Sequence, residues 1–219
     1  MPNYGDPEYW ENRYREQEGR TFDWLEDWTS LKEIVERLVS KDASVLILGC
    51  GNSEFSEQMY SEGYERISNI DISTVVIEQM AMRNSDKPTM TWQVMDVRDL
   101  KFPEEKFDIA IDKSTIDALL CGEDAYLNVA KMTREVQRTL KTGGTYMAIS
   151  YGTPESRLEH FHWEHLHWDV SNEVIGEDGD NPHYIYLCRK KEGADQICQE
   201  KWAQVEESLM EDDIPEDAD

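Results

Sequence analysis

Several features that would place this chain of 219 residues in a membrane or in the secretory pathway are missing from its sequence. No run of 18 apolar residues occurs, so we expect no transmembrane helix. The first residues do not form a basic region followed by an apolar one, so we expect no signal peptide. The four cysteines form no C-x-x-C pair, which argues against a zinc ribbon or a thioredoxin-type site. A reducing compartment, cytosolic or nuclear, fits best, and we expect the cytoplasm.

Positive charge is also scarce. The chain has 22 basic and 47 acidic residues, which gives a formal net charge of −25. Such a field repels the phosphates of nucleic acids and anionic membrane surfaces, so we expect neither as a partner. It favours a basic protein partner or a cationic substrate; the alternative is that the acidity serves solubility alone. We expect the chain to act as a monomer.

The part of the sequence around which the rest is organised is the stretch 45–53. Four apolar residues end abruptly in Gly49-Cys50-Gly51 and then in polar residues. This pattern predicts a buried strand, a tight turn and the start of a helix. In an open α/β sheet, ligands bind at the carboxyl ends of such strands. We therefore expect a ligand site at this turn.

Predicted strands and helices alternate as far as residue 150, which favours a parallel, doubly wound α/β sheet. The expected strands are 45–48, 67–70, 92–95, 107–111 and 145–150, and the expected helices after the first strand are 53–62, 75–83 and 125–140. Gly143 and Gly144 are expected to end the last of these helices. The segments 167–175 and 184–189 flank a turn-rich loop and predict a C-terminal antiparallel hairpin that closes the sheet.

The two ends of the chain differ from this middle part. Residues 7–39 are rich in aromatic residues and predict amphipathic helices with a break near Gly19, so we expect residues 1–40 to form a helical cap over the ligand pocket. Residues 202–219 contain eight acidic and no basic residues. We expect residues 193–219 to form an acidic tail, first helical and solvated, then disordered. The main domain is expected to span residues 41–192.

The residues after the first strand indicate which ligand binds there. A dinucleotide-binding turn would carry a third glycine where this chain has Glu54, whose charge would repel a pyrophosphate near a helix N-terminus. Asp71 lies 20 residues after Gly51, a spacing that suits a carboxylate bound to both hydroxyls of a ribose. Asp96 ends the next strand and can reach an adenine amino group, with Val97 offering apolar contact and a backbone N–H.

Acidic residues at successive strand ends, without a phosphate-binding glycine, favour S-adenosylmethionine as the ligand. This cofactor has a ribose and an adenine, carries no phosphate, and bears a positive sulfonium. Aromatic rings attract such a cation, and Trp10, Tyr14 and Trp24 are the candidates. Taken singly, each acid could instead cap a helix and each aromatic residue could belong to the core.

Four motifs resemble a subgroup of the seven-β-strand, Rossmann-like methyltransferases that use S-adenosylmethionine. They are L-G-C-G-N-S at 48–53, N-I-D-I-S at 69–73, M-D-V at 95–97 and D-K-S-T-I-D-A-L at 112–119. The N-terminal motifs Y-W-x-x-R-Y at 9–14 and F-D-W at 22–24 are similar to the same subgroup. The subgroup contains protein-lysine methyltransferases of translation elongation factor 1-alpha and a relative that acts on citrate synthase. The resemblance covers roughly residues 5–150, and the D-K-S-T-I-D-A-L element is its most specific part.

The resemblance implies a seven-stranded, mostly parallel sheet and a set of cofactor-binding residues. That set is Trp10, Tyr14, Trp24, Gly49, Gly51, Asp71, Ile72, Asp96, Val97 and Lys113. In it, Asp71 takes the ribose, Asp96 takes the adenine, and Lys113 lies beside the cofactor. Related chains often have Gly where this chain has Ser114, a replacement that we expect to be tolerated.

Methyl transfer to lysine requires a neutral amine, because an ammonium has no lone pair. A carboxylate near the acceptor could bind and orient the ammonium while its proton leaves to water. Asp112 and Asp117 are the candidates for this catalytic role. Asp117 could instead be a first-turn acid favoured by the helix dipole, and Lys113 could form a structural salt bridge.

Other interpretations are a small-molecule methyltransferase and a cofactor-binding scaffold without catalysis. An NAD-dependent reductase is disfavoured by Glu54 and by the absence of a Tyr-x-x-x-Lys pair. The four histidines between residues 160 and 167 alternate with aromatic residues, and we interpret them as packing, with no metal site. Cys50 is interpreted as a small turn residue and not as a nucleophile.

Overall fold

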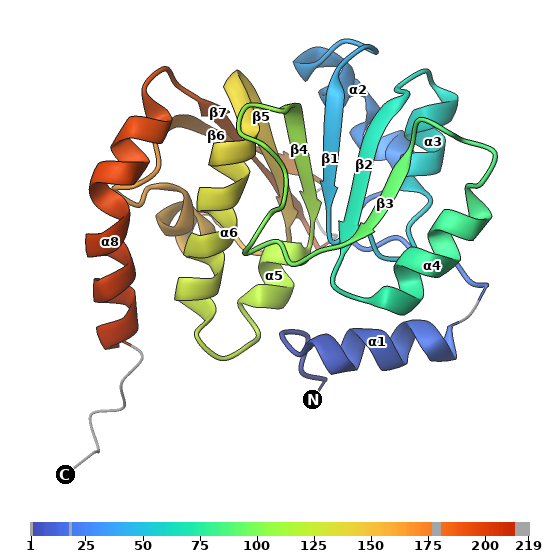
Figure 1. Ribbon diagram of the computed structural model, residues 1–219, viewed down its shortest axis with the longest axis horizontal. Helices are drawn as coiled ribbons and strands as arrows, with labels where there is room; N and C mark the ends of the chain where they lie inside the picture. Colours follow the sequence, from blue (N-terminus) through green and yellow to red (C-terminus); the bar gives the residue numbers. More distant parts are fainter. Residues whose placement is uncertain (1, 18, 177–180, 213–219) are drawn as a thin grey trace.

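The computed structural model describes residues 2–17, 19–176 and 181–212 and contains a seven-stranded sheet in the order β3-β2-β1-β4-β5-β7-β6 (Figure 1). The strands are β1 (Ser44–Leu48), β2 (Arg66–Asp71), β3 (Thr91–Val94), β4 (Phe107–Lys113), β5 (Leu140–Ser150), β6 (Trp168–Ile175) and β7 (His183–Lys190). The helices are α1 (Pro7–Glu16), α2 (Trp28–Leu38), α3 (Phe55–Ser61), α4 (Thr74–Arg83), α5 (Thr115–Leu119), α6 (Ala125–Thr139), α7 (Pro154–Arg157), the 3-10 helix η1 (Leu158–Phe161) and α8 (Ala194–Asp212).

Strands β1 to β5 pair in parallel, whereas β7 pairs antiparallel with both β5 and β6. The predicted doubly wound sheet with a C-terminal antiparallel hairpin is therefore confirmed. In the register of the central strand, Leu48 lies beside Ile70 of β2 and Asp112 of β4. The carboxyl ends of the parallel strands thus meet at one edge, and α1 lies across that edge (Figure 1).

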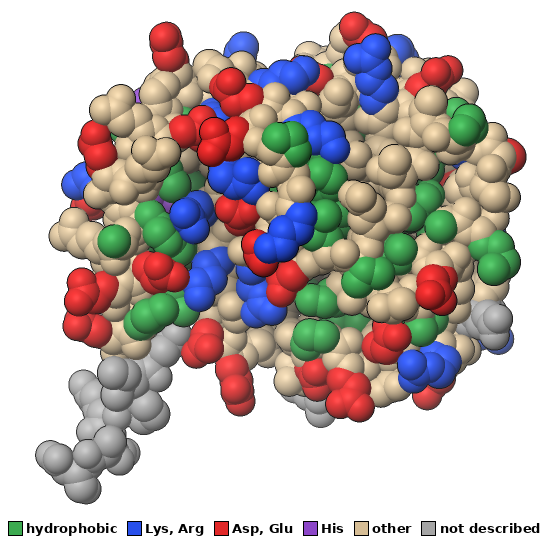
Figure 2. All heavy atoms as spheres, viewed as in Figure 1, with side chains coloured by type: hydrophobic (Ala, Val, Ile, Leu, Met, Phe, Trp, Pro, Cys, Tyr) green, Lys and Arg blue, Asp and Glu red, His purple; other side chains and the backbone are tan. Residues whose placement is uncertain are grey.

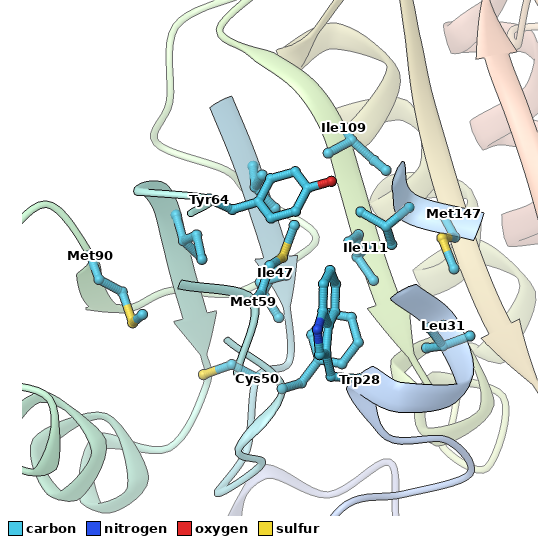
Figure 3. Packing of buried hydrophobic residues seen from close by; sticks show 14 of the residues in the cluster. Trp28, Leu31, Ile47, Cys50, Met59, Tyr64, Met90, Ile109, Ile111 and Met147 are labelled. Atoms are coloured by element: carbon cyan, nitrogen blue, oxygen red, sulfur yellow. The ribbon is translucent and has the colours of Figure 1, made fainter. Parts of the chain in front are cut away.

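Both faces of the sheet are covered, which explains why β1 is apolar throughout. Val45 and Ile47 point into a core shared with α2, α3 and α4, and Leu46 and Leu48 point into a second core shared with α5 and α6. In the first core, Trp28 of α2 packs edge-on against aromatic rings of its neighbours (Figure 3). Because both faces are packed, the sheet holds the carboxyl ends of its strands in fixed positions.

The N-terminal 40 residues divide into two parts. Helix α1 and the segment that follows it lie at the carboxyl edge of the sheet, where a cap was expected (Figure 1). Helix α2 instead packs its buried side chains Trp28, Leu31 and Val35 into the core of the sheet. The expected boundary at residue 40 stays a prediction, because α2 packs in the same core as the strands that follow.

The C-terminal segment differs from its expected form as a solvated helix. Helix α8 begins at Ala194 and packs on α6, and its Trp202 is buried. The Trp202 ring lies 4.9 Å from the His165 ring and 4.7 Å from the Arg134 guanidinium carbon. The acidic composition of residues 202–219 did not indicate that the Trp202 ring would be buried in these contacts. The expectation of disorder falls on residues 213–219, which lie outside the described part of the chain.

Two strands are longer than expected, and this matters for the site. Strand β4 continues through Asp112 to Lys113, so Asp112 is a strand residue paired with Ala148. Strand β5 begins at Leu140 and contains Gly143 and Gly144, which were expected to end a helix. Within the described residues, no helix is both long and apolar enough to cross a membrane.

Candidate active site

A cavity of about 900 Å³ opens at the carboxyl edge of the parallel strands. Its volume falls within the range of ligand pockets, about 300–1,000 Å³. Every residue predicted to bind the cofactor lines it: Trp10, Tyr14, Trp24, Gly49, Gly51, Asp71, Ile72, Asp96, Val97 and Lys113. Of the two predicted catalytic residues, Asp117 lines the cavity and Asp112 does not. The structure therefore brings together residues from six separate segments of the sequence.

The glycine turn after β1 forms the floor of the cavity. Gly49 and Gly51 have φ angles of +56° and +53°, in the left-handed region that favours glycine. A Cβ atom at Gly49 would lie 2.2 Å from Thr115 Oγ1, and one at Gly51 would lie 2.8 Å from Tyr14 Oη. Any larger residue would collide with these side chains. The glycines therefore allow α1 and α5 to approach the turn closely.

Asp71 is a buried carboxylate at the end of β2. Its Oδ2 accepts a hydrogen bond from the Gly51 N–H at 2.9 Å, and its Oδ1 accepts one from the Ser73 N–H at 3.0 Å. Burial raises the pKa of Asp71 to about 6, even though these backbone N–H groups favour the charged form. A carboxylate has about four acceptor positions, so lone pairs remain for the two hydroxyls of a ribose.

Asp96 has a partner that the sequence did not reveal. Arg98 donates hydrogen bonds to its carboxylate from Nε and Nη2 at distances of 2.7 to 3.1 Å. Partial burial raises the pKa of Asp96, but the hydrogen bonds and charge of Arg98 outweigh this and lower it overall. An adenine amino group at this place would share the carboxylate with Arg98. Arg98 also binds the Asn128 side chain at 2.9 Å, which fixes the pair to α6.

The predicted aromatic residues gather on one side of the cavity. Trp10 and Tyr14 stack with ring centroids 5.8 Å apart, and Trp24 meets Trp10 edge-on at 6.2 Å. The guanidinium of Arg13 lies 5.2 Å from the Trp24 ring, so one cation already packs against this group. Such rings can also attract a sulfonium, which carries a positive charge.

Lys113 has a structural partner as well as a place in the cavity wall. Its ammonium donates to Asp23 Oδ1 at 2.9 Å and to the Trp24 carbonyl at 3.0 Å. Burial lowers its pKa, and the charge of Asp23 opposes this effect. Lys113 therefore ties the F-D-W segment to the end of β4. Asp23, for which the F-D-W motif predicted no role, supplies the carboxylate of this ion pair.

The two predicted catalytic acids lie in different surroundings. Asp112 is fully buried, accepts the Tyr146 hydroxyl at 2.8 Å and the Thr115 N–H at 2.7 Å, and points away from the cavity. Burial raises the pKa of Asp112 to about 7. Because the side chain of a strand residue alternates between faces, the longer β4 turns this carboxylate into the core. Asp112 therefore does not reach the cavity in which an acceptor would lie.

Asp117 does reach the cavity, but it is already paired. Its Oδ1 lies 2.9 Å from Arg157 Nη2, a contact between α5 and α7 that the sequence did not predict. Its Oδ2 accepts the Ser114 hydroxyl at 3.2 Å. Ser114 has a φ of +71°, in the region that favours glycine, which gives a physical reason for the glycine of related chains. Here the serine hydroxyl gains a bond to Asp117.

Glu54 and Cys50, which lie on either side of the end of the glycine turn, differ in their surroundings. The Glu54 carboxylate lies outside the cavity, where it accepts the Thr21 hydroxyl at 3.1 Å and pairs with Arg83 at 2.7 Å. Its carboxylate therefore does not touch a ligand in the cavity, and Arg83 balances part of its charge. Cys50 is buried, and burial raises its pKa well above the usual value, as suits a turn residue and not a nucleophile.

Of the four histidines between residues 160 and 167, His160 and His165 are buried, whereas His162 is exposed. His160 lies 4.8 Å from the Tyr126 ring and 5.3 Å from the Trp163 ring, measured between centroids. Burial lowers the pKa values of His160 and His165 to about 4, so both rings are neutral at physiological pH. In the described part of the chain, no three potential ligand side chains lie close enough together to hold a metal ion.

Comparison with known proteins adds to this geometry. The family model described as a methyltransferase domain matches residues 46–148. EEF1A lysine methyltransferase 4 of Bos taurus is 30% identical over 198 residues, which cover 86% of this chain and 77% of that protein. This chain belongs to the S-adenosylmethionine-dependent methyltransferase family. The eEF1A lysine and N-terminal methyltransferase of Mus musculus is 41% identical over 150 residues, and the match covers 67% of this chain and 22% of that protein.

This methyltransferase thus spans about a fifth of the length of that mouse relative, and about three quarters of the bovine one. Its fold resembles that of the N-methyltransferase NodS from Bradyrhizobium japonicum, with a TM-score of 0.62, 16% identity, and coverage of 84% of this chain and 99% of NodS. The predicted family, fold and cofactor are confirmed. The cavity fits S-adenosylmethionine, because it offers a buried carboxylate, Asp71, with free acceptor positions and an aromatic wall.

Proposed function

We propose that this methyltransferase transfers a methyl group from S-adenosylmethionine to the side-chain amine of a lysine in a protein, and that the protein is translation elongation factor 1-alpha. The observation that carries the proposal is the match to EEF1A lysine methyltransferase 4, which extends over 86% of this chain. A second protein with eEF1A lysine in its name matches over 67% of the chain.

The residues of the cavity would divide the work as follows. Asp71 and the glycine turn would hold the ribose end of the cofactor, while Asp96 with Val97 would hold the adenine end. The cofactor supplies a methyl group already activated on a sulfonium, whose bond to sulfur breaks as the lysine nitrogen forms the new bond. The protein therefore has mainly to position the two reactants and to exclude water. Asp117 would orient the lysine ammonium before its proton leaves to water.

The charge of the molecule supports a basic protein as substrate. The formal net charge is −25, and a field of that sign attracts basic surfaces. The acidity is uneven on the face seen in Figure 2: basic side chains gather over α6, and acidic ones are frequent along the edge where α1 lies. The edge with α1 is the edge of the cavity. We propose that a basic substrate approaches there, in the cytoplasm, and that the enzyme works as a monomer.

The test is methyl transfer with isotopically labelled S-adenosylmethionine to purified elongation factor 1-alpha, followed by mass spectrometry of peptides. We expect label on the Nε atom of a lysine in the intact factor and none on free lysine. An Asp71→Ala variant is the negative control, because it removes the ribose-binding carboxylate. Label that appears in small metabolites of a lysate and not in the factor would contradict the proposal and favour a small-molecule methyltransferase.

A further inference from the structure

An arginine that the proposed reaction has not yet used lies behind the wall of the cavity. Arg157 of α7 and Asp117 of α5 form an ion pair whose side chains are 9% and 3% exposed. A buried ion pair is costly to desolvate and is often no more stabilising than apolar residues of the same shape. Stability alone therefore gives a weak reason for this pair. Its place beside the cavity gives a stronger one.

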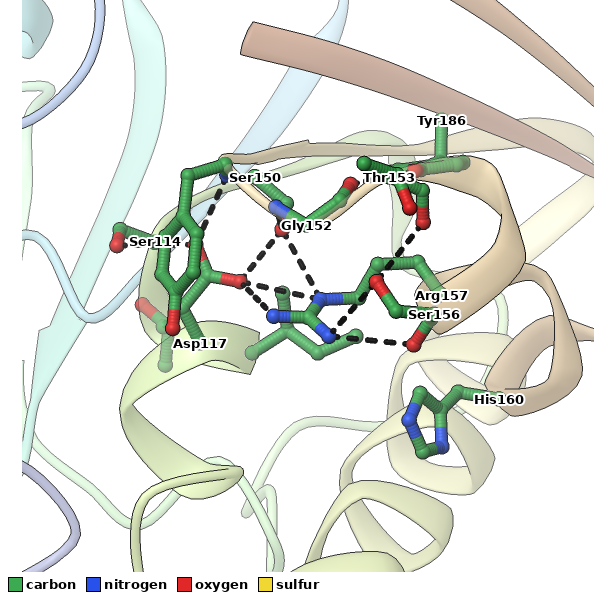
Figure 4. A network of polar contacts seen from close by, with 12 residues as sticks. Ser114, Asp117, Ser150, Gly152, Thr153, Ser156, Arg157, His160 and Tyr186 are labelled. Carbon is green, nitrogen blue, oxygen red and sulfur yellow. Dashed lines mark hydrogen bonds and ion pairs between the residues drawn. The ribbon is translucent and has the colours of Figure 1, made fainter. Parts of the chain in front are cut away.

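The guanidinium of Arg157 is fixed on several sides (Figure 4). Its Nε donates to Ser150 Oγ at 3.1 Å as well as to Asp117 Oδ1 at 3.2 Å, and its Nη1 donates to the Ser156 carbonyl at 3.2 Å. A Cβ atom on Gly152 would lie 2.3 Å from the guanidinium carbon, so the absence of a side chain there lets Arg157 lie against the backbone. The Gly152 carbonyl in turn accepts the Tyr186 hydroxyl at 2.7 Å.

The two oxygens of Asp117 are used differently. Oδ1 is bound by Arg157 and Ser150, neither of which lines the cavity. Oδ2 has two longer contacts, with the Ser114 hydroxyl at 3.2 Å and the Tyr151 N–H at 3.3 Å, and both of these residues line the cavity. Oδ2 is therefore the oxygen on the cavity side, and it keeps capacity for a further donor.

Tyr151 completes this end of the cavity. Its side chain is 55% exposed, and the Arg157 guanidinium carbon lies 5.5 Å from its ring centroid. Burial and the charge of Asp117 raise the pKa of the Tyr151 phenol, so the ring is neutral and its face can attract a cation. Asp117 Oδ2 and the Tyr151 ring together make a place for one ammonium group.

We propose that Arg157 is a positioning residue for lysine methylation: it fixes Asp117 and Tyr151 as the lysine-binding end of the cavity and balances the charge of Asp117. The inference rests on the proposed function. A lone carboxylate beside a lysine ammonium would raise the pKa of that lysine and oppose loss of its proton. The nearby guanidinium offsets this effect. The proton leaves to water, the nitrogen lone pair forms the N–C bond, and the electrons of the S–C bond pass to sulfur.

The test compares pH profiles of kcat/KM, on elongation factor 1-alpha, for the whole protein and three arginine variants. Arg157→Met should lower kcat/KM by about tenfold or more and move the rise of activity with pH upward by about one pH unit, because the substrate ammonium loses its proton less readily. Arg157→Lys should recover part of the activity and the parental profile. Arg37→Met, which removes an arginine from an exposed ion pair with Glu173, is the matched control and should match the parent.

Calorimetry with S-adenosylhomocysteine separates this role from a structural one. The Kd of Arg157→Met should stay within about twofold of the parent, since a distorted cavity would weaken both ligands. A parental pH profile in Arg157→Met, or an equal loss of cofactor affinity, would overturn the inference. If Arg157→Met does not fold, the exposed Tyr151 decides: Tyr151→Ala should raise the KM for the factor by about tenfold and Tyr151→Phe should not. An unchanged KM in Tyr151→Ala also overturns it. No transfer by the parent protein overturns the proposed function as well.

Discussion

The two ends of the cavity each contain a buried carboxylate, and they hold it in different ways. Asp71 is held by backbone N–H groups of Gly51 and Ser73, which belong to the neighbouring turns. Asp117 is held by side chains, Ser150 and Arg157, that lie 33 and 40 residues further along the chain. The first arrangement depends on local backbone geometry. The second depends on how α5 packs against a segment that is distant in the sequence, from the end of β5 to α7.

The largest effect expected is on the end held by the backbone. Asp71→Ala should weaken S-adenosylhomocysteine binding by about 3 kcal/mol, roughly a hundredfold in Kd, because hydrogen bonds from the ribose to a charged acceptor are lost. The measurement is isothermal titration calorimetry. Asp86→Ala, which removes an exposed acid with 76% side-chain exposure, is the control and should leave the Kd unchanged. Equal affinity in Asp71→Ala would show that the ribose is held elsewhere.

The next effect tests the glycine turn of the same end. Gly49→Ala places a Cβ atom 2.2 Å from Thr115 Oγ1 and strains a residue with φ of +56°, so it should destabilise the protein by about 2–4 kcal/mol. Gly193→Ala has a similar φ of +80° but meets nothing within 4 Å, and should cost only about 1 kcal/mol. Urea unfolding of both variants measures the difference. If both variants lost the same free energy of unfolding, the clash with Thr115 would contribute nothing and the backbone strain alone would explain the loss.

A smaller effect concerns Asp112, which is buried in the core and does not line the cavity. Burial raises its folded-state pKa to about 7, above an ordinary value of about 3.9. Between these values the folded state binds more protons than the unfolded state, so stability falls as pH rises. From pH 6 to pH 8 this group should cost about 1 kcal/mol. Asp112→Asn should flatten the decline of the unfolding midpoint with pH, and a parental slope would contradict this assignment.

The same contrast explains how much could be predicted from the sequence. The fold and the cofactor end depend on contiguous patterns: an apolar strand, a glycine turn, and Asp71 at a fixed spacing. Hence all ten residues predicted to bind the cofactor line one cavity. Asp117 was also predicted from its motif, but the contacts that hold its carboxylate could not be predicted in this way. Arg157 lies in a four-residue helix without a motif, and nothing in the sequence indicates that it meets Asp117.

The errors have physical causes of the same kind. Asp112 was expected at the end of a strand, but β4 runs two residues further and turns it into the core. Glu54 was expected near the ligand, but its carboxylate pairs with Arg83 of α4 and does not line the cavity. In both cases the sequence correctly predicted a carboxylate near the end of a strand or turn. It did not predict the direction in which that side chain points. Direction depends on strand length and on partners that are distant in the sequence.

We propose that one end of the cavity binds the cofactor and that the other end orients a lysine. Asp117→Asn tests this most directly, when methyl transfer to elongation factor 1-alpha and the Kd for S-adenosylhomocysteine are measured on the same preparation. We predict that kcat falls by about tenfold or more while the Kd stays within about twofold, because the variant removes the charge of Asp117 and leaves Asp71 and the glycine turn unchanged. Parental turnover in Asp117→Asn would contradict the proposal that Asp117 orients the lysine.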